Sequence, residues 1–269
     1  MSVGLETSRI EPFDFETNAA TRFKALSQLF DLSTERHLLA RGLVPGWHCL
    51  EVGAGGGSIA RWLSERVGPA GRVAATDIDT RFLRGSRSPN LEVWRHDITL
   101  DPLPEGAFDL IHTRMTLIHI PERDRVLERL IRTLRPGGWL VAEEFDALSL
   151  CADPKVSPGE VPLKTHSAMQ RLNQDRGVDG RYGRLLLSRF RDLALDETDA
   201  EGRVAMVQKG TPGAALLRAS YELRRTAMIE AGYLSDDEFE SDLEKMAAAG
   251  FMMPSPVLWT AWGKKGGKE

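Results

Sequence analysis

The sequence predicts an α/β protein whose mostly parallel sheet carries helices on both faces. Two observations lead to this prediction. Short strand-like runs alternate with segments long enough for a helix, and a glycine-rich turn follows the first strand. Parallel neighbours need such crossovers, because a tight hairpin joins only antiparallel strands. The runs are His48–Val52, Arg72–Thr76, Leu91–Arg95, Phe108–Thr113 and Gly138–Glu143.

Apolar spacing and capping residues place the helices of the first half. Before the first strand, apolar residues at helical spacing predict an amphipathic helix within residues 17–41. Ser58 is a favourable N-cap for a helix that Gly68 ends, and Pro121 can open a second helix. The turn Arg135-Pro-Gly-Gly138 then leads into the fifth strand.

The second half of the chain adds further helices and two strands. Pro154, Pro158 and Pro162 mark a loop, and strand character returns at residues 203–208 and 257–262. The capping-box pattern Ser235-x-x-Glu238 opens the last helix. Helices are expected near residues 161–177, 181–193, 212–231 and 235–249.

Composition narrows the class of protein. The 269 residues, 42% of them apolar, are enough for one large domain or two small ones, and we expect a single domain over residues 1–269. The 35 basic and 39 acidic residues are interspersed, which argues against a surface for nucleic acid. Cys49 and Cys151 have no metal-ligand spacing, so neither a disulfide framework nor a metal site is expected.

Targeting signals and membrane spans are not expected. The first residues lack a basic segment followed by an apolar one, and no apolar run is long enough to cross a bilayer. A cytoplasmic protein is the simplest expectation.

The glycine-rich turn at residues 53–57 predicts a cofactor site. Glycines there allow positive φ angles and let a ligand approach the main chain closely. A dinucleotide loop would need glycine or alanine at its sixth position, where this chain has Ser58. Glu51, two residues before the first glycine, would repel a pyrophosphate and attract an ammonium or sulfonium group. The charge of the site therefore favours a cationic ligand.

Two aspartates mark the ends of the next strands. Asp77 follows the second strand, twenty residues after Gly57, where a carboxylate can accept hydrogen bonds from both hydroxyls of a ribose. Asp97 follows the third strand and can accept from an adenine amino group, with Ile98 as an apolar neighbour. Ligands of open α/β sheets bind at these carboxyl ends, so the residues are expected to form one site.

These motifs resemble the class I S-adenosylmethionine-dependent methyltransferases. Glu51-Val-Gly-Ala-Gly-Gly-Gly57 is similar to the first motif of that family, Thr76-Asp-Ile-Asp79 to its second and His96-Asp-Ile98 to its third. Phe108-Asp-Leu-Ile-His-Thr-Arg114 and Leu134-Arg-Pro-Gly-Gly-Trp-Leu-Val141 are similar to the signatures of its fourth and fifth strands. The resemblance covers about residues 40–145 and implies a Rossmann-like, seven-stranded, mostly parallel sheet with an antiparallel last strand.

The resemblance also implies roles for single residues. The glycine loop would lie against the methionine part of the cofactor with Glu51 near its amino group, while Asp77 would hold the ribose and Asp97 with Ile98 the adenine. Thr113 and Arg114 would face the cofactor and the methyl acceptor. The implied cofactor-binding residues are Glu51, Gly53, Ala54, Gly55, Gly57, Asp77, Ile78, Asp97, Ile98, Thr113 and Arg114.

The resemblance divides the chain by role. Residues 1–42 would form a helical lid, 43–145 the cofactor core, 146–198 a helical substrate insertion after the fifth strand, and 199–263 the rest of the sheet with its helices, with a flexible tail at 264–269.

Methyl transfer is an in-line displacement, which needs alignment of the acceptor and a base only if the acceptor must lose a proton. His119 is the candidate base, with hydrogen bonding to a loop as the simpler alternative, while His112 is expected to be a packing residue. The candidate acceptor contacts are Phe23, Phe30, His166, Arg181, Arg184 and Met253.

The predicted function is methylation of an oxygen, nitrogen or carbon atom of a small molecule, in the style of quinone- and natural-product-modifying enzymes. Nucleic-acid acceptors are not expected, and a homodimer is the expected assembly if the chain is not a monomer. Two rivals share the glycine loop: an NAD(P)-dependent reductase, against which Glu51 and Ser58 count, and a catalytically silent S-adenosylmethionine-binding regulatory protein.

Overall fold

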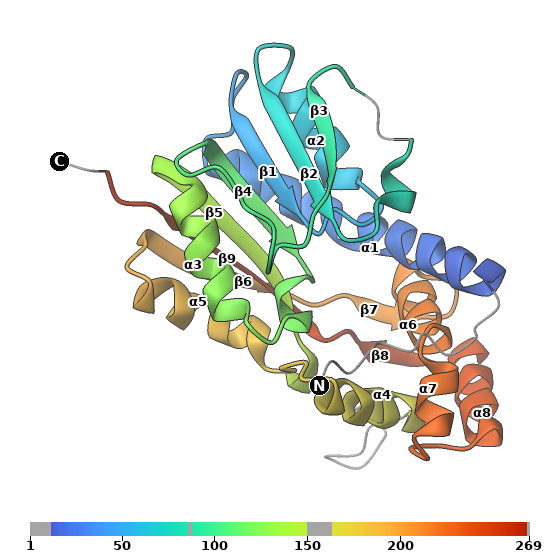
Figure 1. Cartoon of the computed structure of the whole chain (residues 1–269). Coiled ribbons are helices and arrows are strands. Elements are labelled where there is room, and N and C mark those ends of the chain that lie inside the picture. Colours follow the sequence, from blue (N-terminus) through green and yellow to red (C-terminus); the bar gives the residue numbers. More distant parts are fainter. Residues whose placement is uncertain (1–11, 86–87, 150–162, 268–269) are drawn as a thin grey trace. The chain divides into compact units, whose positions relative to one another are not determined.

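A seven-stranded sheet organises the structure, a computed structural model that describes residues 12–85, 88–149 and 163–267 (Figure 1). Its strand order is β3-β2-β1-β4-β5-β9-β6, with β9 antiparallel to both of its neighbours. The first five strands pair in parallel, so the predicted seven-stranded, mostly parallel sheet with an antiparallel last strand is confirmed. The strands are β1 (His48–Val52), β2 (Arg72–Asp77), β3 (Leu91–Arg95), β4 (Phe108–Arg114), β5 (Leu134–Asp146), β6 (Asp196–Arg203) and β9 (Val257–Lys264).

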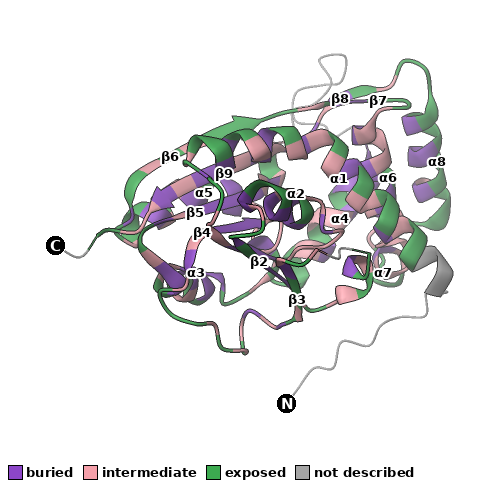
Figure 2. Ribbon diagram, turned by 90° about the horizontal axis from the view of Figure 1, so that it is seen from above, coloured by how far each residue is buried: buried purple, intermediate pink, exposed green. Residues whose placement is uncertain are grey.

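Helices cover both faces of this sheet. Helix α2 (Ser58–Val67) and Leu38 of α1 (Pro12–Ala40) pack with Cys49, Leu110 and Val141 on one face. Helices α3 (Arg123–Thr133) and α5 (Tyr182–Asp192) pack with Leu50 and Ile111 on the other. Neighbouring residues of one strand thus serve opposite faces, as the period of two requires. Figure 2 shows the buried residues along β4 and β5.

The described chain forms two compact units. The sheet unit comprises residues 30–85, 88–149, 177–204 and 256–267, and the helical unit comprises residues 12–29, 163–176 and 205–255. The helical unit has its own core around Tyr221 and Phe239. Its elements are the first part of α1, α4 (Lys164–Asp175), α6 (Pro212–Glu222), α7 (Arg225–Glu230), α8 (Asp236–Ala247), β7 (Met206–Gln208) and β8 (Met252–Pro254). Within residues 146–198, predicted as a helical substrate insertion, α4 belongs to the helical unit and α5 to the sheet unit.

Three sequence predictions are corrected in detail. The strand predicted at 203–208 is two elements: β6 ends at Arg203, whereas β7 pairs with β8 in a separate two-stranded sheet. β6 is a polar edge strand with most residues exposed, so apolar alternation could not reveal it. Gly57, in the left-handed conformation, is the N-cap of α2, and Ser58 is already helical. Helix α3 begins at Arg123, two residues after Pro121.

The predicted capping box of the last helix is confirmed. Ser235 accepts from the Glu238 amide, and the Glu238 side chain accepts from the Ser235 amide at the start of α8. The predicted proline-marked loop lies in residues 150–162, outside the described residues. No helix in the described ranges is long and apolar enough to cross a membrane. Three further short helices, η1 (Thr80–Leu83), η2 (Leu117–His119) and η3 (Ala147–Ser149), follow β2, β4 and β5.

Candidate functional site

The glycine loop between β1 and α2 is folded tightly against its neighbours. Gly53, Gly55 and Gly57 have φ angles of 69°, 51° and 73°, a region that side chains other than glycine rarely adopt. The amides of Gly53 and Ala54 both donate to the carbonyl of Thr76 on β2. A Cβ at Gly53 would lie 2.0 Å from Oγ1 of Thr116. Glycine at position 53 is therefore required both by the backbone angle and by the space.

Asp77 connects this loop to the end of β2. Its Oδ2 accepts from the Gly55 amide at 2.8 Å, and its Oδ1 accepts from the Asp79 amide at 2.9 Å. A carboxylate has about four acceptor positions, so each oxygen keeps one for a ligand hydroxyl. Beside it, the Ile78 side chain is 68% exposed. This pair offers both hydrogen-bond acceptors and apolar surface.

Asp97 is placed similarly at the end of β3. Its Oδ1 accepts from the amide and the hydroxyl of Thr99, and the hydroxyl bond lowers the pKa of Asp97 most strongly. Its Oδ2 has no hydrogen-bond partner among the described residues. Ile98 is buried, and its carbonyl accepts from Arg129 at 2.7 Å. The carboxylate is thus held ionised with one oxygen open to a donor such as an amino group.

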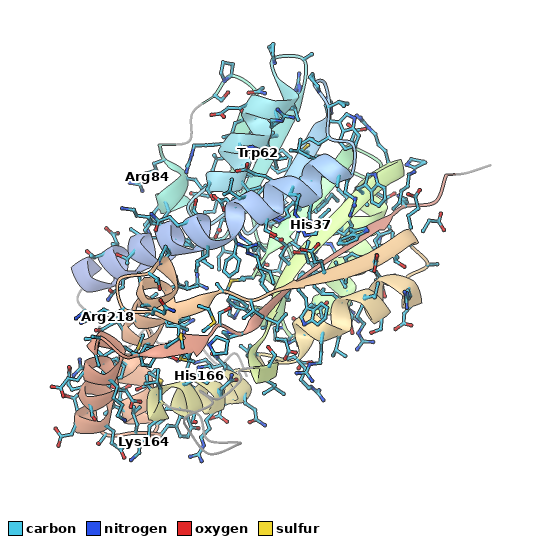
Figure 3. All side chains as sticks on the ribbon, turned by 180° about the vertical axis from the view of Figure 1, so that it is seen from behind. His37, Trp62, Arg84, Lys164, His166 and Arg218 are labelled. Carbon is cyan, nitrogen blue, oxygen red and sulfur yellow. The ribbon has the colours of Figure 1, made fainter. Side chains whose placement is uncertain are left out.

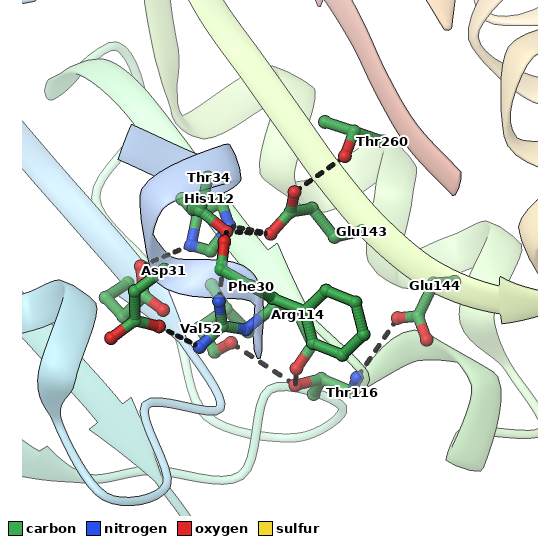
Figure 4. A network of polar contacts seen from close by, with 11 residues as sticks. Phe30, Asp31, Thr34, Val52, His112, Arg114, Thr116, Glu143, Glu144 and Thr260 are labelled. Carbon is green, nitrogen blue, oxygen red and sulfur yellow. Dashed lines mark hydrogen bonds and ion pairs between the residues drawn. The ribbon is translucent and has the colours of Figure 1, made fainter. Parts of the chain in front are cut away.

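A row of buried polar side chains crosses one face of the sheet next to the loop (Figure 4). Glu51 of β1 and His112 of β4 are direct neighbours in the parallel register, and Glu51 Oε2 lies 2.7 Å from His112 Nδ1. His112 Nε2 lies 3.3 Å from Oε2 of Glu143 on β5. The hydroxyls of Thr34 on α1 and Thr260 on β9 donate to Glu143 at 2.5 and 2.6 Å. We call these five residues the polar row.

The polar row holds strongly shifted groups. Burial alone would lower the pKa of His112, but the two carboxylates around it raise this pKa to about 9. Burial would raise the pKa of Glu143, whereas its hydrogen bond and ion pair with His112 lower it to about 2. The imidazole is therefore an imidazolium between two carboxylates at neutral pH. The prediction that His112 is only a packing residue is corrected, because both ring nitrogens have carboxylate partners.

Thr113 and Arg114, both expected to face the cofactor and the methyl acceptor, lie on opposite faces of the sheet. Arg114 donates to Oδ1 of Asp31 at 2.7 Å and to the hydroxyl of Thr34 at 2.9 Å, so its guanidinium is engaged with α1. Thr113 follows His112 in the strand and belongs to the opposite face from Glu51. Its buried hydroxyl has no partner among the described residues. The structure brings Arg114, but not Thr113, to the face that carries Glu51.

Glu144 orders the loop that follows β4. Its Oε1 accepts from the amides of Thr116 and Leu117 at 3.0 and 2.7 Å, while its Oε2 is buried without a partner in the described part of the chain. Burial raises the pKa of Glu144 to about 8. The same loop contains Met115 with a φ of 54° and ends with His119, whose side chain is exposed. The candidate base therefore lies on a loop whose backbone amides are bound by the Glu144 carboxyl group.

The candidate acceptor contacts of the sheet unit are already partnered. Arg184 forms two hydrogen bonds with the buried Asp146 at 2.6 and 2.8 Å, and Arg181 pairs with Asp179 at 3.3 Å. Phe30 is fully buried and meets Phe145 edge-on at 5.8 Å. Both arginines, predicted as acceptor contacts, are therefore engaged with carboxylates of the chain itself.

The remaining candidates belong to the helical unit. His166 is buried, 3.1 Å from the Tyr221 hydroxyl and 3.1 Å from the Gln170 amide, and burial lowers its pKa to about 4 (Figure 3). Met253 is fully buried in the same core, and Phe23 is half-buried. His166 and Met253 thus occupy core positions of this unit.

The helical unit also contains a polar cavity of about 510 Å³ between α1, α6 and α7. Its charged lining is internally balanced, because Arg218 pairs with Glu222, and Arg225 pairs with Asp236 and Glu240 of α8. In residues 12–85, 88–149 and 163–267, no group of three or more His, Cys, Asp or Glu residues is arranged to hold a metal ion.

Sequence reasoning missed Glu143, Glu144, Thr34 and Thr116 as parts of the site. A usable signal was present, because Glu143 and Glu144 are adjacent in a strand of a sheet that helices cover on both faces. Charged residues in such a strand cannot be solvated and must have partners. Which partners they have follows from the register, which the sequence alone does not give.

Comparison with known proteins supports one family. Residues 50–142 match a family model described as a methyltransferase domain. The chain is 33% identical over 114 residues to the ubiquinone/menaquinone biosynthesis C-methyltransferase UbiE of Laribacter hongkongensis, a region that is 40% of this chain and 47% of that protein. It is 31% identical over 215 residues to an uncharacterized 37.1 kDa protein in transposon TN4556 of Streptomyces fradiae, covering 77% of this chain and 59% of that protein. The chain spans about half the length of the UbiE relatives it matches.

The fold agrees with this match. Phosphoethanolamine N-methyltransferase 2 of Haemonchus contortus, solved with phosphomonomethylethanolamine and S-adenosylhomocysteine, aligns with a TM-score of 0.53 at 13% identity, covering 95% of this chain and 57% of that chain. The matched residues 50–142 contain the glycine loop, Asp77, Asp97 and two members of the polar row, Glu51 and His112. Residues 50–142 of this chain are therefore similar to a methyltransferase domain, and the fold is that of solved methyltransferases.

Proposed function

We propose that this protein binds S-adenosylmethionine and transfers its methyl group to an oxygen, nitrogen or carbon atom of a small-molecule acceptor. The observation that carries the proposal is the charge arrangement around the glycine loop. The buried Glu51 carboxylate lies at the end of β1, and α2 begins after the loop without a side-chain cap. A carboxylate attracts an ammonium group, and an uncapped helix N-terminus attracts a carboxylate.

These residues fit the zwitterionic methionine part of the cofactor. The α2 amides can hold its carboxylate while Glu51 holds its ammonium group. The open acceptor positions of Asp77 fit the two ribose hydroxyls, and the open Oδ2 of Asp97 fits the adenine amino group. The exposed Ile78 offers an apolar contact for the ribose and base. A pyrophosphate would meet the carboxylate of Glu51, which disfavours a dinucleotide.

The cofactor, when bound, supplies an electrophilic methyl group on a sulfonium. This chain then has to hold the acceptor in line with that group and keep water away, because charge disappears in the transition state. We assign His119 as the group that accepts a proton from an acidic acceptor, since it is exposed on the loop after β4. Arg181, Arg184, Phe23, Phe30, His166 and Met253 stay predicted acceptor contacts.

The acceptor is proposed to be a small organic molecule. The name of the Laribacter relative, a C-methyltransferase of ubiquinone/menaquinone biosynthesis, supports a carbon atom as the methyl acceptor. A cytoplasmic location and a homodimer stay predictions from the sequence.

The direct experiment is a methyl-transfer assay with S-adenosylmethionine labelled in the methyl group and a panel of phenols, hydroquinones and amines. We expect label in one acceptor class and one equivalent of S-adenosylhomocysteine per methyl transferred. Binding of S-adenosylhomocysteine without turnover on any acceptor would favour the silent regulatory protein. Oxidation of NADH in place of methyl transfer would favour the reductase.

A further inference from the structure

We propose that His112 is a positioning residue that fixes the Glu51 carboxylate for the ammonium group of the cofactor, through the polar row that ends on α1 and β9. The inference rests on the proposed function, because it concerns the same cofactor site. It goes further in giving a task to residues that do not themselves touch the ligand.

The geometry leaves the ring of His112 one orientation. Nδ1 is bound to Glu51 at 2.7 Å and Nε2 to Glu143 at 3.3 Å, so a rotation of the ring breaks both contacts. Glu51 is only 4% exposed, and its Oε2 accepts from His112. Its Oε1 has no hydrogen-bond partner among the described residues. One oxygen is thus held by the protein, and the other is left for a ligand.

The far end of the polar row is anchored on two elements. Glu143 accepts from Thr34 of α1 and from Thr260 of β9, in addition to its contact with His112. Thr260 and Glu143 are direct cross-strand neighbours, so this contact is set by the sheet register. The position of Glu51 is therefore coupled through His112 to four separate elements of the sheet unit.

The charges of this cluster favour a cationic ligand. Three carboxylates, those of Asp31, Glu51 and Glu143, face two cations, His112 and Arg114. The imidazolium form follows from its two carboxylate partners, which raise the pKa of His112 to about 9. One negative charge is then unbalanced, and an ammonium group beside Glu51 would neutralise it.

Two substitutions test the contacts of the two ring nitrogens of His112 separately. The side-chain amide of asparagine lies near the position of Nδ1, whereas that of glutamine reaches the position of Nε2. His112→Asn can keep the bond to Glu51, while His112→Gln keeps only the bond to Glu143. His37→Gln is the matched control, because His37 is also buried in the sheet unit and lies in the field of Glu143, but its ring contacts Trp262 and Glu201 and makes no hydrogen bond to the polar row.

The probes are S-adenosylhomocysteine, which has the ammonium group, and 5′-methylthioadenosine, which lacks the amino-acid part, both measured by titration calorimetry. His112→Gln is expected to weaken the binding of S-adenosylhomocysteine about 10- to 100-fold, the range for a hydrogen bond to a charged group. It should leave the binding of 5′-methylthioadenosine unchanged. His112→Asn should lose less affinity for S-adenosylhomocysteine, and His37→Gln should change the affinity for neither ligand. Retained binding of 5′-methylthioadenosine also shows that the site is folded.

Three results with the wild type and His112→Gln would overturn the proposal. Unchanged binding of S-adenosylhomocysteine by His112→Gln removes the positioning role, and equal weakening of both ligands shows a merely structural role. Wild-type protein that binds neither ligand refutes the proposed function and this inference with it. If His112→Gln does not fold, Thr260→Val tests the other end of the polar row: a selective loss for S-adenosylhomocysteine supports the proposal, and no change overturns it.

Discussion

Replacing Gly53 by alanine tests how tightly the glycine loop is packed. The φ angle of Gly53 is 69°, and an added Cβ would lie 2.0 Å from Oγ1, 2.8 Å from Cγ2 and 3.0 Å from Cβ of Thr116. Thr116 cannot withdraw freely, because its amide donates to Glu144 and its hydroxyl lies 3.3 Å from the carbonyl of Val52. The substitution should therefore cost both backbone strain and steric overlap.

The two costs can be separated. A left-handed conformation costs alanine roughly 1–2 kcal/mol, partly offset by the smaller freedom of its unfolded state, about 0.4–1 kcal/mol. Inserting an atom into a packed site adds typically about 1–3 kcal/mol. Gly106→Ala is the matched control, because Gly106 has a φ of 59° and nothing within 4 Å of an added Cβ. We expect a loss of roughly 2–4 kcal/mol for Gly53→Ala and about 1 kcal/mol for Gly106→Ala.

Urea denaturation gives the free energy of unfolding of each variant. Adding Thr116→Ala to Gly53→Ala removes the two closest atoms, so the double variant should recover most of the extra loss relative to Thr116→Ala alone. If Gly53→Ala costs no more than Gly106→Ala, or if Thr116→Ala restores nothing, the described packing of this loop is wrong.

Three other predictions concern titration, a helix cap and a buried hydroxyl. The pKa of His112 is about 9 in the folded protein against 6.5 for a free histidine, so its contribution to stability is complete below pH 6.5 and is lost as pH rises to about 9. Burial raises the pKa of Glu144 from 4.5 to about 8, so the free energy of unfolding also falls as pH rises across that range. Glu144→Gln should flatten the pH dependence of the free energy of unfolding between pH 4.5 and 8. An unaltered pH dependence would contradict this assignment. Ser235→Ala breaks the capping box of α8 and should cost about 1 kcal/mol, measured by urea denaturation, with a neutral result counting against the cap. Thr113→Val removes a buried hydroxyl that has no partner in the described residues, so it should raise the free energy of unfolding by about 1 kcal/mol. A lower free energy of unfolding would reveal a missing partner.

The cofactor loop was predictable because its signals are local. A strand, three glycines in alternate positions and a helix follow each other within residues 48–67, and the φ values of Gly53, Gly55 and Gly57 confirm the expected backbone. The capping box at Ser235 and Glu238 was predictable for the same reason, since its two partners are three residues apart.

The polar row was not predictable, because its contacts join residues far apart in the chain. Thr34 and Glu143 are 109 residues apart, and Glu143 and Thr260 are 117 apart. Their meeting depends on the strand order and on the register of β4, β5 and β9. A histidine in an apolar strand is indistinguishable from a packing residue until these neighbours are known, which is why the sequence alone predicts a packing role for His112. The edge strand β6 was not predictable for a different reason, because its polar residues give no apolar alternation.

The measurement that tests the central claim most directly is thermal unfolding of the wild-type protein with S-adenosylhomocysteine or NADH in excess. A ligand at 100 times its dissociation constant adds about 2.7 kcal/mol, which raises the midpoint by roughly 5–10 °C in a chain of this length. A site built from Glu51, Asp77 and Asp97 predicts stabilisation by S-adenosylhomocysteine and none by NADH. Stabilisation by NADH alone, or by neither ligand in protein shown by mass spectrometry to carry no bound cofactor, would contradict it.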